Sequence, residues 1–185
     1  MSAVPDLPVI IRGEPADLDR IGPLWQSLQA HHLAVSTVDL PARDPDASWA
    51  ARRALYERWF ASGDAELWLL QRGAGIDGEG GDGGNDTSRG DSAGDVVGYA
   101  MVRIGGQSMT YAVDRLATLE TLVVARELRG TGAGSRLITA AFDDLRARDF
   151  DGVEVTHMEG NEGAGRLYAA HGFQPFARML IAPLD

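Results

Sequence analysis

Apolar side chains in the first third of the chain follow first a strand pattern and then a helix pattern. Residues 8–12 (PVIIR) form a short apolar run that predicts a strand. Apolar positions then recur every three or four residues, which predicts a helix from about Ala16 toward His31 and His32. The apolar positions of this helix are Leu18, Ile21, Leu24, Trp25 and Leu28.

A second helix is expected after Pro41 and Pro45, with Asp46 or Ser48 as its N-cap. Its large apolar side chains fall on two neighbouring faces. They are Trp49, Tyr56 and Phe60 on one face, and Leu55 and Trp59 on the other. Aromatic residues this dense predict substantial burial of the helix.

Two apolar runs, residues 66–71 and 96–104, predict a pair of strands. The segment between them, residues 73–95, contains nine glycines and six acidic residues against one arginine. Its apolar surface is too small to offset the conformational entropy lost on ordering. We therefore expect a flexible loop inserted in a hairpin.

Strands and helices alternate regularly in the second half of the chain. The pattern predicts strands at 116–124, 153–158 and 173–181, and helices at about 132–149 and 161–171. Alternation of this kind, together with the earlier hairpin, predicts an α/β (α+β) fold with helices on both faces of one sheet. A length of 185 residues fits a single domain over residues 1–185.

The composition excludes several classes of chemistry. The chain has no cysteine and no lysine, so disulfides, cysteine-based metal sites, cysteine nucleophiles, P-loops and lysine Schiff bases are ruled out, and we expect no metal. A formal net charge of -10 argues against nucleic acid and anionic membranes as partners. We also expect a cytoplasmic protein, because no basic leader or membrane-spanning apolar run is visible.

A glycine-rich turn, Arg129-Gly-Thr-Gly-Ala-Gly134, lies between the strand that ends at Val124 and the following helix. Glycines there let backbone N–H groups approach a ligand, and the helix N-terminus adds partial positive charge. A phosphate or pyrophosphate is the expected guest, and a tight connection without a ligand is the alternative. A dinucleotide-binding GxGxxG turn does not fit, because Ser135 stands where its third glycine would be.

A second motif, NEGAGRLYAAHGF at residues 161–173, follows the next strand. The pair of motifs, separated by a helix and a strand, resembles the GNAT superfamily of N-acetyltransferases. The turn is similar to the Q/R-x-x-G-x-G/A acyl-CoA loop of that family. Residues 161–173 are similar to its N-x-x-A-x-x-L-Y-x-x-x-G-F segment.

The resemblance implies a mixed, mostly antiparallel sheet of about six to seven strands that splays beside the acyl-CoA site after strand 116–124. Acetyl-CoA would be the co-substrate, with Asn161 and Tyr168 beside its arm near the thioester. Further residues are implied as its contacts. They are Leu122, Val123 and Val124 along the arm, and Arg129, Gly130, Thr131, Gly132, Ala133, Gly134 and Ser135 around the pyrophosphate.

Two residues are candidates for catalysis. The family uses a tyrosine at the position of Tyr168 to protonate the departing thiolate, and its phenol pKa of about 10 suits a thiol of about 8.5; the alternative is a packed aromatic. Glu120 interrupts an apolar strand beside the expected splay. It is a candidate general base, a group that positions a cationic substrate, or one half of a structural ion pair.

The acceptor side of the site is less defined by the sequence. Five residues are candidates for it, although packing in the core is the alternative for each. They are Trp25, His31, His32, Tyr111 and His157.

The expected activity is transfer of an acetyl group to a primary amine of a small molecule. Modification of a protein N-terminus or lysine is one alternative, and a non-catalytic acyl-CoA-binding regulatory module is another. Only one strand fits after Phe173, where many GNAT proteins have a terminal hairpin. A shortened sheet edge recruits partners, so we expect a homodimer.

Overall fold

The computed structural model describes residues 8–73 and 94–182. Most of the predicted flexible loop, residues 74–93, lies outside the described residues. The elements follow in the order β1 (Val9–Gly13), η1 (Pro15–Asp17), α1 (Leu18–Val35), α2 (Pro45–Ser62), β2 (Ala65–Gln71), β3 (Val96–Gly106), β4 (Leu116–Val124), η2 (Arg126–Leu128), α3 (Ala133–Ala147), β5 (Gly152–Val155) and α4 (Glu162–Ala170).

The five strands form one sheet in the sequential order β1-β2-β3-β4-β5. The pairs β1–β2, β2–β3 and β3–β4 are antiparallel, and β4 and β5 are parallel. A parallel neighbour requires a crossover connection, which α3 supplies. The mixed, mostly antiparallel sheet is therefore confirmed, with five described strands instead of six to seven.

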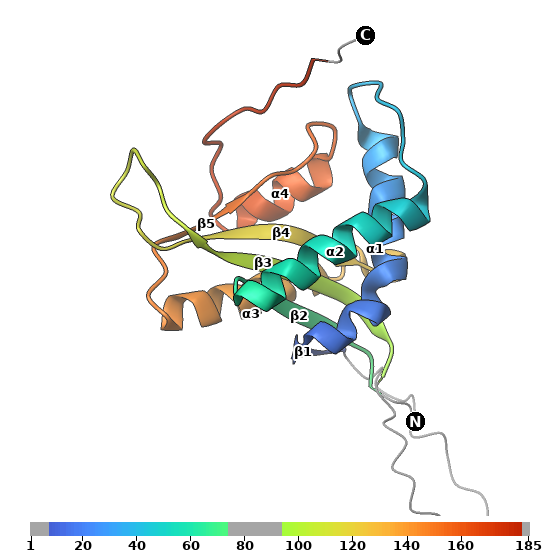
Figure 1. Cartoon of the computed structure of the whole chain (residues 1–185), viewed down its shortest axis with the longest axis horizontal. Helices are drawn as coiled ribbons and strands as arrows, with labels where there is room; N and C mark the ends of the chain where they lie inside the picture. Colours follow the sequence, from blue (N-terminus) through green and yellow to red (C-terminus); the bar gives the residue numbers. More distant parts are fainter. Residues whose placement is uncertain (1–7, 74–93, 183–185) are drawn as a thin grey trace, which may run out of the picture.

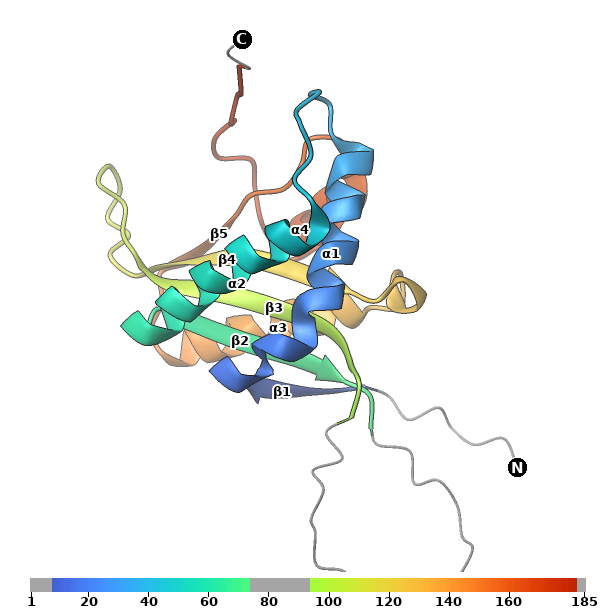
Figure 2. The same cartoon turned by 45° about the vertical axis from the view of Figure 1, so that its right-hand side comes forward.

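Helices cover both faces of the sheet, as the sequence predicts. In Figures 1 and 2, α1 and α2 cross one face and α3 lies behind the other. On the first side, Ile21 and Tyr56 are fully buried against sheet residues that include Leu69. On the second side, Leu137 and Ile138 of α3 pack with Tyr168 of α4 in a separate cluster. The sheet thus separates two cores.

The predicted N-cap of α2 is wrong. Asp44 caps the helix, and its carboxylate accepts hydrogen bonds from the backbone N–H groups of Asp46 (3.0 Å) and Ala47 (3.1 Å). Pro45 then occupies the first turn, where its fixed φ suits a helix and its missing N–H costs nothing. The helix therefore begins before the two residues that the pattern indicated.

The predicted strand 153–158 is too long. β5 ends at Val155, so His157 and Met158 belong to the loop that leads to α4. Pairing with β4 covers only four positions, Leu116–Leu119. The apolar content of the segment could not show where β5 ends, because the end is set by the point at which β5 and β4 separate.

The predicted strand 173–181 is wrong as well. The segment after α4 forms no strand, and beyond Phe173 four of its large apolar side chains are at least 58% exposed. They are Phe176, Met179, Leu180 and Ile181. A strand needs a neighbouring edge to supply hydrogen bonds, and this segment leaves the sheet instead (Figure 1).

Candidate active site

A β-bulge places Glu120 next to the sheet's opening. In the β3–β4 ladder, Leu119 faces Val102 and Thr121 faces Met101, so Glu120 is the extra residue. The bulge changes the face of the sheet toward which the odd-numbered side chains of β4 point. Before it, Leu119 packs on the α3 side; after it, Thr121 contacts α2, and Val123 packs with the α1 and α2 core.

The sheet opens along the second half of β4. Parallel pairing with β5 ends at Leu119 and Val155, whereas β4 continues to Val124. The backbone of Glu120–Val124 therefore has no β5 partner on that side. This is the splay that the family resemblance implied. It leaves those N–H and C=O groups of Leu122–Val124 that point away from β3 without a strand partner, so that they can bind an extended ligand arm.

The glycine-rich turn presents unpaired amides at the start of α3. Gly130 and Gly132 have φ values of 78° and 87°, a region that side chains rarely enter. Gly132 is the N-cap of α3 and supplies no side-chain cap. The N–H groups of residues 133–135 consequently have no partner within the helix. A diphosphate fits this cradle in both charge and geometry.

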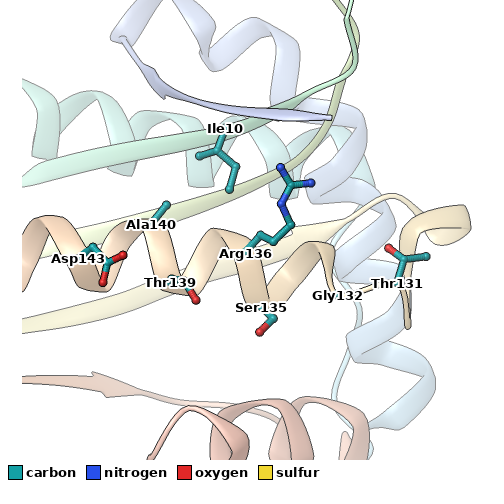
Figure 3. A pocket seen from close by; sticks show the side chains of 8 residues that line it. All are labelled: Ile10, Thr131, Gly132, Ser135, Arg136, Thr139, Ala140 and Asp143. Carbon is teal, nitrogen blue, oxygen red and sulfur yellow. The ribbon is translucent and has the colours of Figure 1, made fainter. Parts of the chain in front are cut away.

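An open groove of about 560 Å³ runs along α3 from this turn. Figure 3 shows Arg136 extending from α3 toward β1, where its guanidinium donates to the Pro8 carbonyl, while Ser135 points to the other side of the helix. The groove contains Thr131 and Gly132 at its end. It therefore continues from the proposed diphosphate cradle over the molecular surface.

Three elements meet at Gly134 in the first turn of α3. A Cβ atom placed on Gly134 would lie 3.4 Å from Leu167 of α4 and 3.9 Å from Leu122 of β4. The anion cradle, the open edge of β4 and the tyrosine-bearing helix α4 are thus adjacent. The structure therefore brings together the three elements that carry the predicted coenzyme contacts.

Ser135 and Asn161 each already have an intramolecular partner. The Ser135 hydroxyl lies 2.6 Å from Nε2 of His171, which links α3 to the end of α4. The side-chain oxygen of Asn161 accepts from the N–H of Ala164 at 3.1 Å and caps α4. The backbone N–H of Ser135 and the amide NH₂ of Asn161 are the groups left to meet a ligand.

Tyr168 is 8% exposed and lies between two rings. Its ring centre is 5.8 Å from that of His157 and 5.5 Å from that of Phe173. Burial raises the pKa of the Tyr168 phenol to about 12. The phenol therefore stays protonated over the physiological range and can donate a hydrogen bond. It is a weaker acid than the free phenol, so its pKa lies further from that of a thiol than the sequence alone predicts.

Glu120 forms an ion pair with Arg103. The Arg103 Nε lies 2.7 Å from Oε1 of Glu120, whose side chain is 20% exposed. Arg103 also donates to the Thr118 hydroxyl at 3.3 Å and lies over the Trp59 ring. One carboxylate oxygen is thus occupied, and the structure displays the ion-pair role among the three that the sequence leaves open.

Four other acceptor candidates lie in two places, three of them on α1 and one beside Tyr168. Trp25 is buried on α1 and donates from Nε1 to the Ser48 hydroxyl at 3.1 Å, while His31 and His32 lie one to two turns further along the helix. Burial lowers the pKa of His32, with further lowering from the charges of His31 and Arg52. His157 lies beside Tyr168.

Tyr111 stands apart from these residues. It lies in the β3–β4 loop, before Leu116, whereas the sheet opens at the other end of β4. Its ring is 56% exposed and packs edge-on against Phe176, with 5.6 Å between centres.

Two arginines near the site were missed by the sequence reading. Arg103 pairs with Glu120, and Arg52 stacks on Trp25 with its guanidinium carbon 4.4 Å from the ring centre. Arg52 had a detectable signal, because it lies four residues before Tyr56 and therefore on the aromatic face of α2. Arg103 had none, since its contact depends on strand register.

Among residues 8–73 and 94–182, no three potential metal ligands cluster. No helix in the same described part is long and apolar enough to cross a membrane.

The family model for the acetyltransferase (GNAT) family matches residues 36–173, most of the 185-residue chain. The chain belongs to the GNAT family of acetyltransferases. Its general chemistry is therefore acyl transfer, as the two motifs predict. No curated protein matches the chain.

Solved structures share the GNAT fold with this chain. A Pyrococcus furiosus protein is 17% identical with a TM-score of 0.67, covering 95% of this chain and 99% of its own. The ribosomal-protein-alanine N-acetyltransferase from Brucella melitensis biovar Abortus 2308 is 16% identical with a TM-score of 0.60 and the same coverages. An acetyltransferase from Trypanosoma brucei is 18% identical with a TM-score of 0.58, again covering 95% and 99%.

Proposed function

We propose that this GNAT protein transfers an acetyl group from acetyl-CoA to a primary amine of a small acceptor. The observation that carries the proposal is the meeting of three features around Gly134. They are the uncapped start of α3, the open edge of β4 at Leu122, and the helix α4 that bears Tyr168.

Each of these features would bind a different part of acetyl-CoA. The amides of residues 133–135 suit the diphosphate, because they carry partial positive charge and lack helical partners. The open backbone of Leu122–Val124 suits the amide groups of the pantetheine arm, which pairs with it as an added strand would. The thioester would then lie beside Tyr168 and Glu120.

The reaction is direct attack of a neutral amine on the thioester carbonyl carbon. A C–N bond forms, the C–S bond breaks, and the electron pair of that bond leaves with sulfur. The Tyr168 hydroxyl donates a proton to the thiolate, and the proton of the attacking amine passes to Glu120 or to water. Tyr168 then regains a proton from solvent, so that the products are an amide and free coenzyme thiol.

Calorimetric titration with acetyl-CoA, combined with thiol release over a panel of amines, tests this proposal. We expect acetyl-CoA to bind and thiol release to require an amine, with Tyr168→Phe retaining binding and losing most of the release. Binding with release from peptides alone would indicate a protein acceptor. Binding without release on amines or peptides would indicate a regulatory module, and no binding would refute the coenzyme assignment.

A further inference from the structure

Arg52 of α2 is a half-buried cation that forms no ion pair in the part of the chain that the structure describes. Within residues 8–73 and 94–182, no carboxylate lies within 4.0 Å of its guanidinium. The next residue, Arg53, shows the contrast, because Asp19 and Glu57 both pair with it. Burying part of an unpaired charge costs free energy, which a bound anion would offset.

Aromatic rings hold the Arg52 guanidinium in place. Its Cζ atom lies 4.4 Å from the ring centre of Trp25 and 5.7 Å from that of Tyr56. Trp25 is 9% exposed and Tyr56 fully buried, so both rings are rigid supports. A guanidinium stacked in this way keeps its N–H fork free to bind a carboxylate with two parallel hydrogen bonds.

The titratable groups of α1 that lie near Arg52 are histidines and not carboxylates. The charged groups that act on His32 are His31 and Arg52, and both lower its pKa in addition to the effect of burial. The lowered pKa keeps His32 mainly neutral at pH 7, so the positive charge here comes from Arg52, in a chain whose formal net charge is -10. The local potential at Arg52 favours an anionic group.

The charges of Arg52 and Glu120 both affect the pKa of one buried tyrosine, Tyr56. The Tyr56 hydroxyl lies 2.6 Å from that of Thr121, the residue after the bulge. Burial is the main cause of the raised pKa of Tyr56, and the charges of Arg52 and Glu120 act on it in opposite directions. The cation and the carboxylate therefore lie on the α2 side of the sheet, around one tyrosine beside the open edge of β4.

We propose that Arg52 binds a carboxylate of the acceptor, so that the acceptor is an amine that also carries an acid, as amino acids do. The inference rests on the proposed function and names its acceptor class. The acceptor carboxylate would accept two hydrogen bonds from the Arg52 guanidinium, which is stacked on Trp25. The acceptor amine would point toward Glu120 and the thioester. A simple amine would leave Arg52 unpaired and place a second cation beside it.

Matched pairs of amino acids and their decarboxylation products test this proposal. Lysine with cadaverine, histidine with histamine, and tyrosine with tyramine each share one amine-bearing skeleton and differ by the carboxylate. We expect kcat/KM for the acid-bearing member to exceed that of its partner by about tenfold or more, as expected for a charge-assisted pair. The difference should arise mainly in KM, because Arg52 binds the acceptor and not the reacting atoms.

Substitution of Arg52 provides the second half of the test. Arg52→Gln should remove the preference within each pair, and Arg52→Lys should restore part of it. Arg58→Gln is the matched control, since Arg58 is an exposed arginine of the same helix and the variant loses the same charge. Thermal unfolding of all three variants separates lost binding from lost folding.

The outcomes distinguish this inference from the proposed function. Equal transfer to both members of each pair, or a preference that Arg52→Gln leaves unchanged, would overturn the role of Arg52 while acetyl transfer stands. If Arg52→Gln does not fold, the preference of the unaltered protein and of Arg52→Lys decides. Bound acetyl-CoA with no transfer to any member would contradict the proposed function, and this inference with it.

Discussion

The hydroxyl groups of Tyr56 on α2 and Thr121 on β4 form a buried hydrogen bond of 2.6 Å. Tyr56 is fully buried and Thr121 is 4% exposed. Thr121 directly follows the bulge at Glu120, so this bond fixes α2 against the part of β4 where the sheet opens. The position of α2, and of Arg52 on it, depends on this contact.

Tyr56→Phe should therefore lower the free energy of unfolding by about 1–3 kcal/mol, because the Thr121 hydroxyl loses its partner while remaining buried. The double variant Tyr56→Phe/Thr121→Val should recover part of this loss, since both polar groups are then gone. Urea denaturation of the single and double variants measures the coupling. Strictly additive losses would show that the two hydroxyls do not interact.

Gly132→Ala should weaken acetyl-CoA binding by about tenfold or more, because alanine disfavours the φ of 87° that directs the amides of α3. Gly63→Ala is the matched control. Gly63 has a φ of 77°, ends α2, and has the same open space around its Cβ position. Both variants should lose similar stability, and calorimetric titration should separate them. Equal acetyl-CoA affinity in both would exclude the turn as the anion site.

Tyr168→Phe should lower kcat by about 100-fold, the lower end of what a positioned proton donor contributes. The pKa of about 12 predicts in addition that Tyr168 produces no basic limb in the kcat profile up to about pH 10. Steady-state kinetics from pH 6 to pH 10 measures both effects. A variant with unchanged kcat would make Tyr168 a packed aromatic and nothing more.

Alkaline pH should destabilise the protein through its buried tyrosines. Burial raises the pKa values of Tyr56, Tyr99 and Tyr168, whereas the unfolded chain releases these protons near pH 10. Above pH 10 the unfolded state holds fewer protons than the folded state, so stability falls as pH rises. For Tyr168 the loss approaches about 2 kcal/mol by pH 12. Thermal unfolding at stepped pH should show a shallower decline in Tyr168→Phe.

We expect Glu120→Gln to lower kcat by about 100-fold, because Oε1 of Glu120 pairs with Arg103 and the second carboxylate oxygen is left to take the amine proton. Arg103→Gln removes the same ion pair and leaves the carboxylate in place, so it is the matched comparison. Loss of activity confined to Glu120→Gln would support a general base. Equal stability losses with unchanged kcat in both variants would assign Glu120 to a structural ion pair.

We expect a homodimer formed over the edge of the sheet at β5. β5 forms one edge of the described sheet, and Phe176 and Leu180 follow α4 with 80% and 85% exposure. Phe176→Ser/Leu180→Ser should convert the dimer to a monomer in light scattering. Val9→Ser is the control, because Val9 is exposed on β1 at the opposite edge. A monomer without any substitution would refute the expectation.

The sequence determined the features that depend on neighbouring residues. Helical periodicity located α1, α2, α3 and α4, and the glycines at 130 and 132 indicated the turn at the start of α3. Such signals are local, because helix hydrogen bonds, caps and positive φ values involve residues a few positions apart.

Only the tertiary structure decided the features that depend on register and on distant partners. Glu66 lies in an apolar run, yet it is 5% exposed and pairs with Arg12 of β1 and with Arg148, which directly follows α3. The bulge moved Thr121 to the α2 side, and the apolar residues 173–181 formed no strand. Strand pairing and buried ion pairs join residues far apart in sequence, so their geometry is fixed only when the whole sheet is assembled.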